Sequence, residues 1–116
     1  ECGGYKGEKQ IAKWLSDNSI KYISQYRFID CKDKKCLPFD FYLPQYNMCI
    51  EYDGQQHFEP IDFAGKGEMW ATEQLTITQY HDDLKTKYCQ DNNIYLFRIS
   101  YLQNIEEELK NLFILI

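Results

Sequence analysis

The chain has 116 residues and a formal net charge of −5. This length indicates one compact domain with a modest core. No run of roughly eighteen apolar residues is present, so we expect no transmembrane helix, and no signal peptide is visible. The negative charge disfavours a domain that binds nucleic acid by itself, because contacts with phosphates dominate such affinity.

The chain opens with Glu-Cys-Gly-Gly rather than Met. We therefore expect residues 1–116 to be a single domain that is either a fragment, with an upstream DNA-binding module missing, or a processed product. Its five cysteines are odd in number, irregularly spaced and without a Cys-x-x-Cys pair. This pattern disfavours a disulfide framework and a structural zinc site, and it favours reduced thiols in an intracellular protein.

Residues 6–18 are predicted to form a helix on the basis of their hydrophobic periodicity. One face of this helix carries Glu8, Ile11, Ala12 and Leu15. Glu8 has two interpretations on that inward face. It sits in an exposed first turn, where the helix dipole favours acids, or it points toward the acidic hairpin described below.

Residues 21–29 are rich in β-forming side chains and predict a strand. Residues 30–37 follow as a polar hairpin loop that carries Lys32, Lys34 and Lys35. These lysines are the clearest candidates for contact with a nucleic-acid backbone, although such lysines also serve solubility alone.

Residues 39–57 predict two strands joined by a tight turn. With a two-residue loop, the register sets Leu43 opposite Met48 and Asp40 opposite Glu51. Side chains alternate between the two faces of a strand pair. One face would then carry Phe39, Phe41, Leu43, Met48, Ile50 and Tyr52. The other face would carry Asp40, Tyr42, Glu51 and Asp53.

The acids of that second face would lie close together on an otherwise apolar strand pair. Unpaired, they would repel each other and resist burial, and a hard cation such as Mg²⁺ (or Mn²⁺) relieves both problems. Asp40, Glu51 and Asp53 are therefore candidate metal ligands; the alternative is a solvated face with ordinary surface acids. The next residues beside this proposed site are Gln55, Gln56 and His57.

Residues 58–73 contain Pro and Gly and show weak periodicity, so we expect a loop. Residues 73–91 predict a helix. Its apolar stripe consists of Ile77, His81, Leu84 and Tyr88. This stripe turns His81 inward, leaves Lys85 at its edge and points Asp82 away from the core.

Residues 94–99 form a nearly continuous apolar run, which predicts a strand buried on both faces in the middle of a sheet. Asn104 followed by Glu107 has the spacing of a helix cap. The last helix would present Ile105, Leu109, Leu112 and Phe113. The order α-β-β-β-α-β-α predicts an α/β fold of the mixed α+β kind, with helices on the faces of a central mixed sheet.

Five short blocks of the chain carry a family resemblance. They are Lys6-Gly7-Glu8, Pro38-Phe39-Asp40-Phe41-Tyr42-Leu43-Pro44, Ile50-Glu51-Tyr52-Asp53-Gly54-Gln55-Gln56-His57-Phe58, Asp82-Asp83-Leu84-Lys85 and Tyr88-Cys89. In these blocks the chain resembles the restriction-endonuclease-like (PD-(D/E)XK) nucleases over nearly its whole length. Within that superfamily it is most similar to very-short-patch-repair endonucleases and to the related homing endonucleases and phage or large-virus proteins of the Glu-Asp-x-His-Asp type.

The resemblance implies a restriction-endonuclease-like core and Mg²⁺-dependent hydrolysis of a DNA phosphodiester bond. It implies that Asp40 is the central metal-binding residue. Glu51 and Asp53 would fill the two alternating positions of the Asp/Glu-x-Lys motif, so the Lys of that motif is absent. His57 then becomes the candidate general base for the attacking water, and Glu8 would orient or polarise it.

The same resemblance implies an Asp-x-x-Lys pair on the following helix, which Asp82 and Lys85 match. Lys85 would neutralise charge that develops on the phosphate. Because periodicity turns His81 inward instead, His81 and Asp82 stand together as candidates. Gln55 and Gln56 join the loop lysines as candidate contacts with DNA.

These inferences predict a DNA endonuclease, either a nickase or a double-strand cleaver. Its partners would be DNA and either a second copy of the chain or a fused DNA-recognition domain, without a membrane. Two alternatives stay open. One is a nuclease-fold module that binds DNA without turnover, and the other is a nuclease that acts on RNA or on recombination intermediates.

Overall fold

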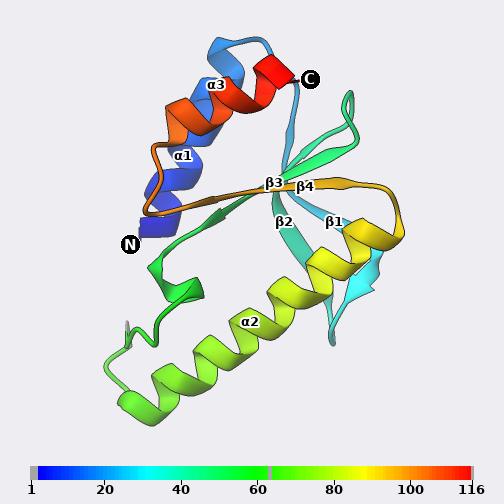
Figure 1. The fold of residues 1–116 in the computed structure, drawn as a ribbon. Coiled ribbons are helices and arrows are strands. Elements are labelled where there is room, and N and C mark those ends of the chain that lie inside the picture. Colours follow the sequence, from blue (N-terminus) through cyan, green and yellow to red (C-terminus); the bar gives the residue numbers. More distant parts are fainter. Residues whose placement is uncertain (1–2, 63, 116) are drawn as a thin grey trace.

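The structure is a computed structural model that describes residues 3–62 and 64–115. Its elements follow the predicted order of helices and strands (Figure 1). They are α1 (Gly3–Asp17), β1 (Ile23–Lys32), β2 (Cys36–Leu43), β3 (Met48–Asp53), the 3-10 helix η1 (Gln55–His57), α2 (Glu68–Asp91), β4 (Tyr95–Ser100) and α3 (Ile105–Leu115). In the described residues, the chain is therefore an α+β fold with a four-stranded mixed sheet and three α-helices.

The strands lie in the order β1-β2-β3-β4. The first three pair antiparallel, and β4 returns through α2 to pair parallel with β3, whose residues are all buried. The prediction that β4 occupies the middle of the sheet is wrong, because β4 is an edge strand and Tyr95 is 54% exposed. Its apolar run still packs on both faces, since Phe97 contacts one core cluster and Leu96 the other.

Helices cover both faces of the sheet. α1 and α3 lie together on one face, and α2 crosses the other face (Figure 1). The core cluster on the side of α1 and α3 consists of Ile11, Leu15, Phe41, Leu43, Met48, Ile50, Tyr52, Ile99, Ile105, Leu109 and Leu112. The cluster on the side of α2 consists of Cys31, Leu37, Phe39, Cys49, Cys89 and Ile94.

The predicted pairing of Leu43 with Met48 in the central hairpin is confirmed, whereas the predicted Asp40–Glu51 pair lies beyond the last paired residues, Phe41 and Ile50. The connection between the two strands has four residues, 44–47, rather than two. Asn47 takes a left-handed backbone conformation with φ of 50°. Asn tolerates that conformation better than most residues, which explains how the longer turn closes without a glycine.

β2 leaves β3 beyond the Phe41–Ile50 pair. At that point the Asp40 N–H donates to the Glu51 carboxylate and no longer to a strand carbonyl. The prediction that Phe39 shares a face with Phe41 is wrong, since Phe39 packs in the cluster on the side of α2. At Phe39 strand β2 has lost its pairing with β3 and keeps only its pairing with β1, so the alternation predicted for the β2–β3 hairpin no longer applies.

Several element boundaries differ from the predictions, and α1 begins at Gly3 rather than at residue 6. β1 and β2 extend into the predicted basic loop and leave a turn of residues 33–35, and α2 begins at Glu68 rather than at residue 73. The cap of α3 is confirmed, because the Glu107 N–H donates to Asn104 Oδ1 at 2.9 Å. In the part of the chain that the structure describes, no helix has both the length and the apolar character needed to cross a membrane.

Candidate functional site

Three carboxylates, those of Glu8, Asp40 and Glu51, lie where β2 parts from β3, and we call them the acid cluster. The Asp40 N–H donates to Glu51 Oε2 at 2.6 Å, and the Tyr52 N–H donates to Asp40 Oδ2 at 2.8 Å. These bonds hold two of the carboxylates between the parted strands and satisfy backbone groups that would otherwise lack a partner there. The structure therefore brings together the acids that the sequence placed opposite each other.

Lys85 reaches this cluster from α2. Its Nζ lies 2.9 Å from Glu51 Oε1 and 5.3 Å from the centre of the Phe39 ring, and both partners of the ion pair are buried. An ammonium group in this position compensates the charge of the most buried acid. α2 thus supplies beside Glu51 a positive charge that the strand motif lacks, because Asp53 stands where that motif has Lys.

Glu8 faces the parted strands rather than an exposed first turn, since α1 already begins at Gly3. A close approach of α1 to β3 makes this possible: a Cβ added at Gly7 would lie 2.4 Å from the Tyr52 ring. Any larger residue would push the helix, and Glu8 with it, away from the sheet. The lack of a side chain at Gly7 therefore helps to position a carboxylate of the acid cluster.

Gln25, which sequence reasoning missed, bridges two acids of the cluster. Its Nε2 lies 3.4 Å from Glu8 Oε1 and 3.5 Å from Asp40 Oδ1. Its backbone is left-handed, with φ of 53°, near the start of β1. Residues other than glycine rarely adopt this conformation, and such strain is concentrated at functional sites. No sequence pattern indicated that Gln25 belongs to the site.

The acid cluster holds more negative charge than its surroundings easily accommodate. Burial, followed by repulsion from Glu51, raises the pKa of Asp40 from 3.8 to about 8. Burial also raises the pKa of Glu8. Mg²⁺ prefers one or two carboxylates together with retained waters and substrate phosphate oxygens. The oxygen donors of Asp40 and Glu51, with Glu8 beside them, fit that preference.

A second group, Asp53, His57 and Asp82, lies at the end of β3, and we call it the imidazole cluster. Its three potential ligand atoms lie within 4.8 Å of one another. η1 turns the chain so that His57 Nδ1 lies 2.9 Å from Asp82 Oδ2 and 3.6 Å from Asp53 Oδ1. With Nδ1 engaged in this way, Nε2 is the ring nitrogen left to accept a proton from a substrate.

The two partners in this pair shift each other's protonation. Burial lowers the pKa of His57, but the hydrogen bond and charge of Asp82, and then the charge of Asp53, outweigh it and raise that pKa above 6.5. Burial raises the pKa of Asp82, and the hydrogen bond from His57 reverses this and lowers it below 3.8. An ionised Asp82 beside a basic imidazole is the arrangement that general-base catalysis needs.

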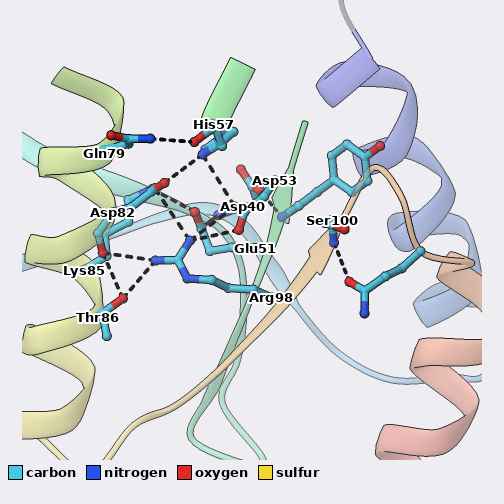
Figure 2. Close-up of polar contacts among 12 residues, drawn as sticks. Asp40, Glu51, Asp53, His57, Gln79, Asp82, Lys85, Thr86, Arg98 and Ser100 are labelled. Carbon is cyan, nitrogen blue, oxygen red and sulfur yellow. Dashed lines mark hydrogen bonds and ion pairs between the residues drawn. The ribbon is translucent and has the colours of Figure 1, made fainter. Parts of the chain in front are cut away.

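Arg98 on β4 is the other site residue that sequence reasoning missed. Its Nη1 lies 3.2 Å from Asp53 Oδ1 and 3.6 Å from Asp82 Oδ1, and its Nη2 donates to the Asp82 carbonyl and to Thr86 Oγ1, both at 3.1 Å (Figure 2). The sequence signal that could have identified Arg98 is that it is a basic residue within the apolar run of residues 94–99.

Asp53 was predicted to bind metal together with Asp40 and Glu51. In the described residues, the charged partners of the Asp53 carboxylate are Arg98 and His57 instead. The structure therefore places this acid in the imidazole cluster. Side-chain alternation put Asp53 and Glu51 on one face, but the Asp53 carboxylate accepts a hydrogen bond from the Arg98 guanidinium of β4 (Figure 2).

The inward placement of His81 is wrong, and the family pattern is the better guide on α2. Asp82 faces the imidazole cluster, whereas His81 Nε2 lies 3.1 Å from Asp33 Oδ2 in the β1–β2 turn. Successive helical residues point about 100° apart, so both cannot face the same site. His81 thus fastens the β1–β2 turn to α2 and does not meet the other candidate catalytic groups.

The predicted DNA-contacting residues fall into two places. Lys32, Lys34 and Lys35 are exposed at the β1–β2 turn, where two of them line a surface hollow of about 370 Å³ together with His81. Gln55 is exposed and donates to Glu59 at 3.2 Å. Gln56 is turned inward under Gly54, and its Oε1 is a buried oxygen without a partner in the described residues.

Comparisons with known proteins give relatives without an assigned activity. Over 65 residues the chain is 35% identical to uncharacterized protein 307L of Invertebrate iridescent virus 6 and 32% identical to uncharacterized protein 033L of Invertebrate iridescent virus 3. The match covers 56% of this chain and 31% of each relative, so the chain spans about a third of their length. No family model and no solved structure matches the chain.

Proposed function

We propose that the chain is a Mg²⁺-dependent DNA endonuclease built on a restriction-endonuclease-like core. The observation that carries this proposal is the acid cluster between the parted strands, with Lys85 beside it at 2.9 Å from Glu51. Phosphodiester hydrolysis needs an activated water and compensation of the charge that develops on the phosphate. The two neighbouring clusters offer residues suited to each need.

Asp40 and Glu51 would hold Mg²⁺, which on binding lowers the pKa of a water and polarises the phosphate oxygens. Lys85 would compensate the charge that develops on the phosphate. Glu8 would hydrogen-bond the attacking water and align it. His57 would take its proton at Nε2, while Asp82 keeps the imidazole oriented through Nδ1.

Specificity for a DNA sequence or structure would come largely from outside this domain. A net charge of −5 gives weak attraction for phosphates, and the exposed lysines of the β1–β2 turn supply only a local positive patch. We therefore assign DNA as substrate and expect a second copy of the chain or a fused recognition domain to direct it.

Supercoiled plasmid provides the direct test. The chain with Mg²⁺ should convert it to nicked or linear DNA, EDTA should stop the reaction, and Asp40→Asn should abolish it. Asp91→Asn removes an acid that is 58% exposed at the far end of α2 and should leave cleavage unchanged. Equal cleavage by Asp40→Asn and the native chain would remove the proposal. Parallel reactions on mismatched, single-stranded and RNA substrates separate DNA cleavage from the RNA alternative.

The pH profile tests the base. His57 must be neutral to accept a proton, and its pKa lies above 6.5, so the cleavage rate should rise with pH through an inflection above that value. Asp82→Asn removes the charge that raises this pKa, so the inflection should move to lower pH and the plateau rate should fall. An inflection that stays in place would show that another group takes the proton.

A further inference from the structure

The structure contains two groups of side chains that could bind a divalent cation, the acid cluster and the imidazole cluster. Ligand geometry favours one of them as the binding site, and charge favours the other. Ligand geometry favours the imidazole cluster, because Asp53, His57 and Asp82 offer three ligand atoms within 4.8 Å of one another. The acid cluster offers carboxylates that are fastened between the parted strands by backbone donors.

Arg98 occupies the imidazole cluster from the side of β4. Its Nη1 contacts both carboxylates, at 3.2 Å from Asp53 and 3.6 Å from Asp82. Its Nη2 is anchored on α2 by the Asp82 carbonyl and by Thr86 Oγ1. A guanidinium presents its donors in a rigid fork that suits carboxylates. The hydrogen bonds and ion pairs to these acceptors therefore hold the Arg98 side chain in place between β3 and α2 (Figure 2).

The charge balance of the two groups differs by one charge when both are in the state that binds metal, with the carboxylates ionised and the imidazole neutral. In the acid cluster, three carboxylates face Lys85, which leaves a net charge of −2. In the imidazole cluster, the two carboxylates of Asp53 and Asp82 face Arg98, which leaves a net charge of −1. A divalent cation would balance the first group and leave an excess positive charge in the second, and uncompensated charge in a buried site is costly.

We propose that Arg98 is a positioning residue that keeps metal out of the imidazole cluster and so reserves His57 for proton transfer. The cation then binds at the acid cluster alone. The inference rests on the proposed nuclease function for the use of His57, but the exclusion of metal is a property of the side chains themselves. Without the guanidinium, Asp53, His57 and Asp82 become a ligand set for a transition metal, because imidazole and carboxylate suit such ions.

Electron paramagnetic resonance of Mn²⁺ locates the native site. Mn²⁺ should bind the native chain at one site, Asp40→Asn should weaken that binding about tenfold or more, and Asp53→Asn and Asp82→Asn should leave it within about twofold. Loss of Mn²⁺ binding in Asp53→Asn or Asp82→Asn, with retention in Asp40→Asn, would overturn the inference. These variants keep the shape of the side chains, so they do not depend on the folding of an Arg98 variant.

The visible absorption spectrum of Co²⁺ tests Arg98 itself. Arg98→Met should gain a Co²⁺ site with bands that shift or vanish when His57→Gln is added, whereas Arg98→Lys keeps the charge and should gain none. Arg98→Met without added Co²⁺ binding would overturn the inference. If the native chain binds no Mn²⁺ and cuts no DNA, the proposed nuclease fails, while the Co²⁺ spectra of the two variants still decide whether Arg98 excludes metal.

Discussion

Replacing the central acid of the site should stabilise the metal-free chain at neutral and higher pH. Burial, followed by repulsion from Glu51, raises the pKa of Asp40 from 3.8 to about 8. The folded chain therefore holds a proton on Asp40 over the range in which the unfolded chain has released it. By linkage, this acid costs no stability below pH 3.8, and the cost grows as the pH rises toward 8.

One pH unit of such a shift corresponds to about 1.4 kcal/mol, so the shift from 3.8 to about 8 sets a ceiling of about 6 kcal/mol on the cost. Asp40→Asn removes the titrating group and keeps an oxygen that accepts the Tyr52 N–H. We expect the variant to match the native chain near pH 4 and to exceed its unfolding free energy by several kcal/mol at pH 8.

Urea unfolding followed by circular dichroism, in EDTA at pH 4.5, 6 and 8, measures this difference. Asp91→Asn is the control, since it removes an exposed acid and should leave the native pH dependence in place. Mg²⁺ should stabilise the native chain at pH 8 and narrow the gap, because a cation replaces the missing proton. A constant difference between Asp40→Asn and the native chain across this pH range would refute the reasoning.

Two further substitutions have matched controls. Lys85→Met leaves Glu51 buried without its ion-pair partner and should lower the unfolding free energy, measured in urea, by about 3–5 kcal/mol. Lys87→Met breaks an exposed ion pair and should lower it by less than about 1 kcal/mol. Similar losses in the two variants would contradict a buried ion pair between Lys85 and Glu51. Gln25→Gly relieves a left-handed backbone worth about 1 kcal/mol and removes the amide between two acids, so stability should rise while plasmid cleavage falls. Ser19→Gly relieves the same backbone strain beyond the end of α1 and should raise stability with cleavage unchanged.

Hydrophobic periodicity predicted the helices well where they cover a core and failed where α2 covers a site. The buried residues of α2 include Lys85 and Cys89, and Asp82 lies on the same side, one turn before Lys85. Hydrophobic periodicity cannot identify an inward helical face whose residues are charged. The stripe of apolar residues therefore turned His81 inward, and only the resemblance to nucleases with an Asp-x-x-Lys pair on this helix pointed to the face of Asp82 and Lys85.

Arg98 and Gln25 show the limit of sequence reasoning about the site itself. Arg98 interrupts an apolar strand, which indicates a partner but does not say that the partner is an acid on a strand that lies beside it only after folding. Gln25 acts through a backbone conformation that its residue type does not favour. Both residues depend on contacts between elements far apart in the chain, whereas Asp40 and Glu51 were found because one short hairpin sets their register.

The failed prediction for Phe39 and the successful one for the acids have a common physical cause. Paired strands leave no room for a side chain between them, so an acid on a continuous ladder faces one layer or the other. Where β2 leaves β3, the Asp40 and Tyr52 N–H groups lose strand partners and take carboxylate oxygens instead. The same departure sends Phe39 to the layer of α2, under Lys85, and opens the gap in which the carboxylates meet. If β2 and β3 stayed paired along their whole length, the predicted side-chain alternation would hold, but no gap would exist in which the carboxylates of the acid cluster could meet.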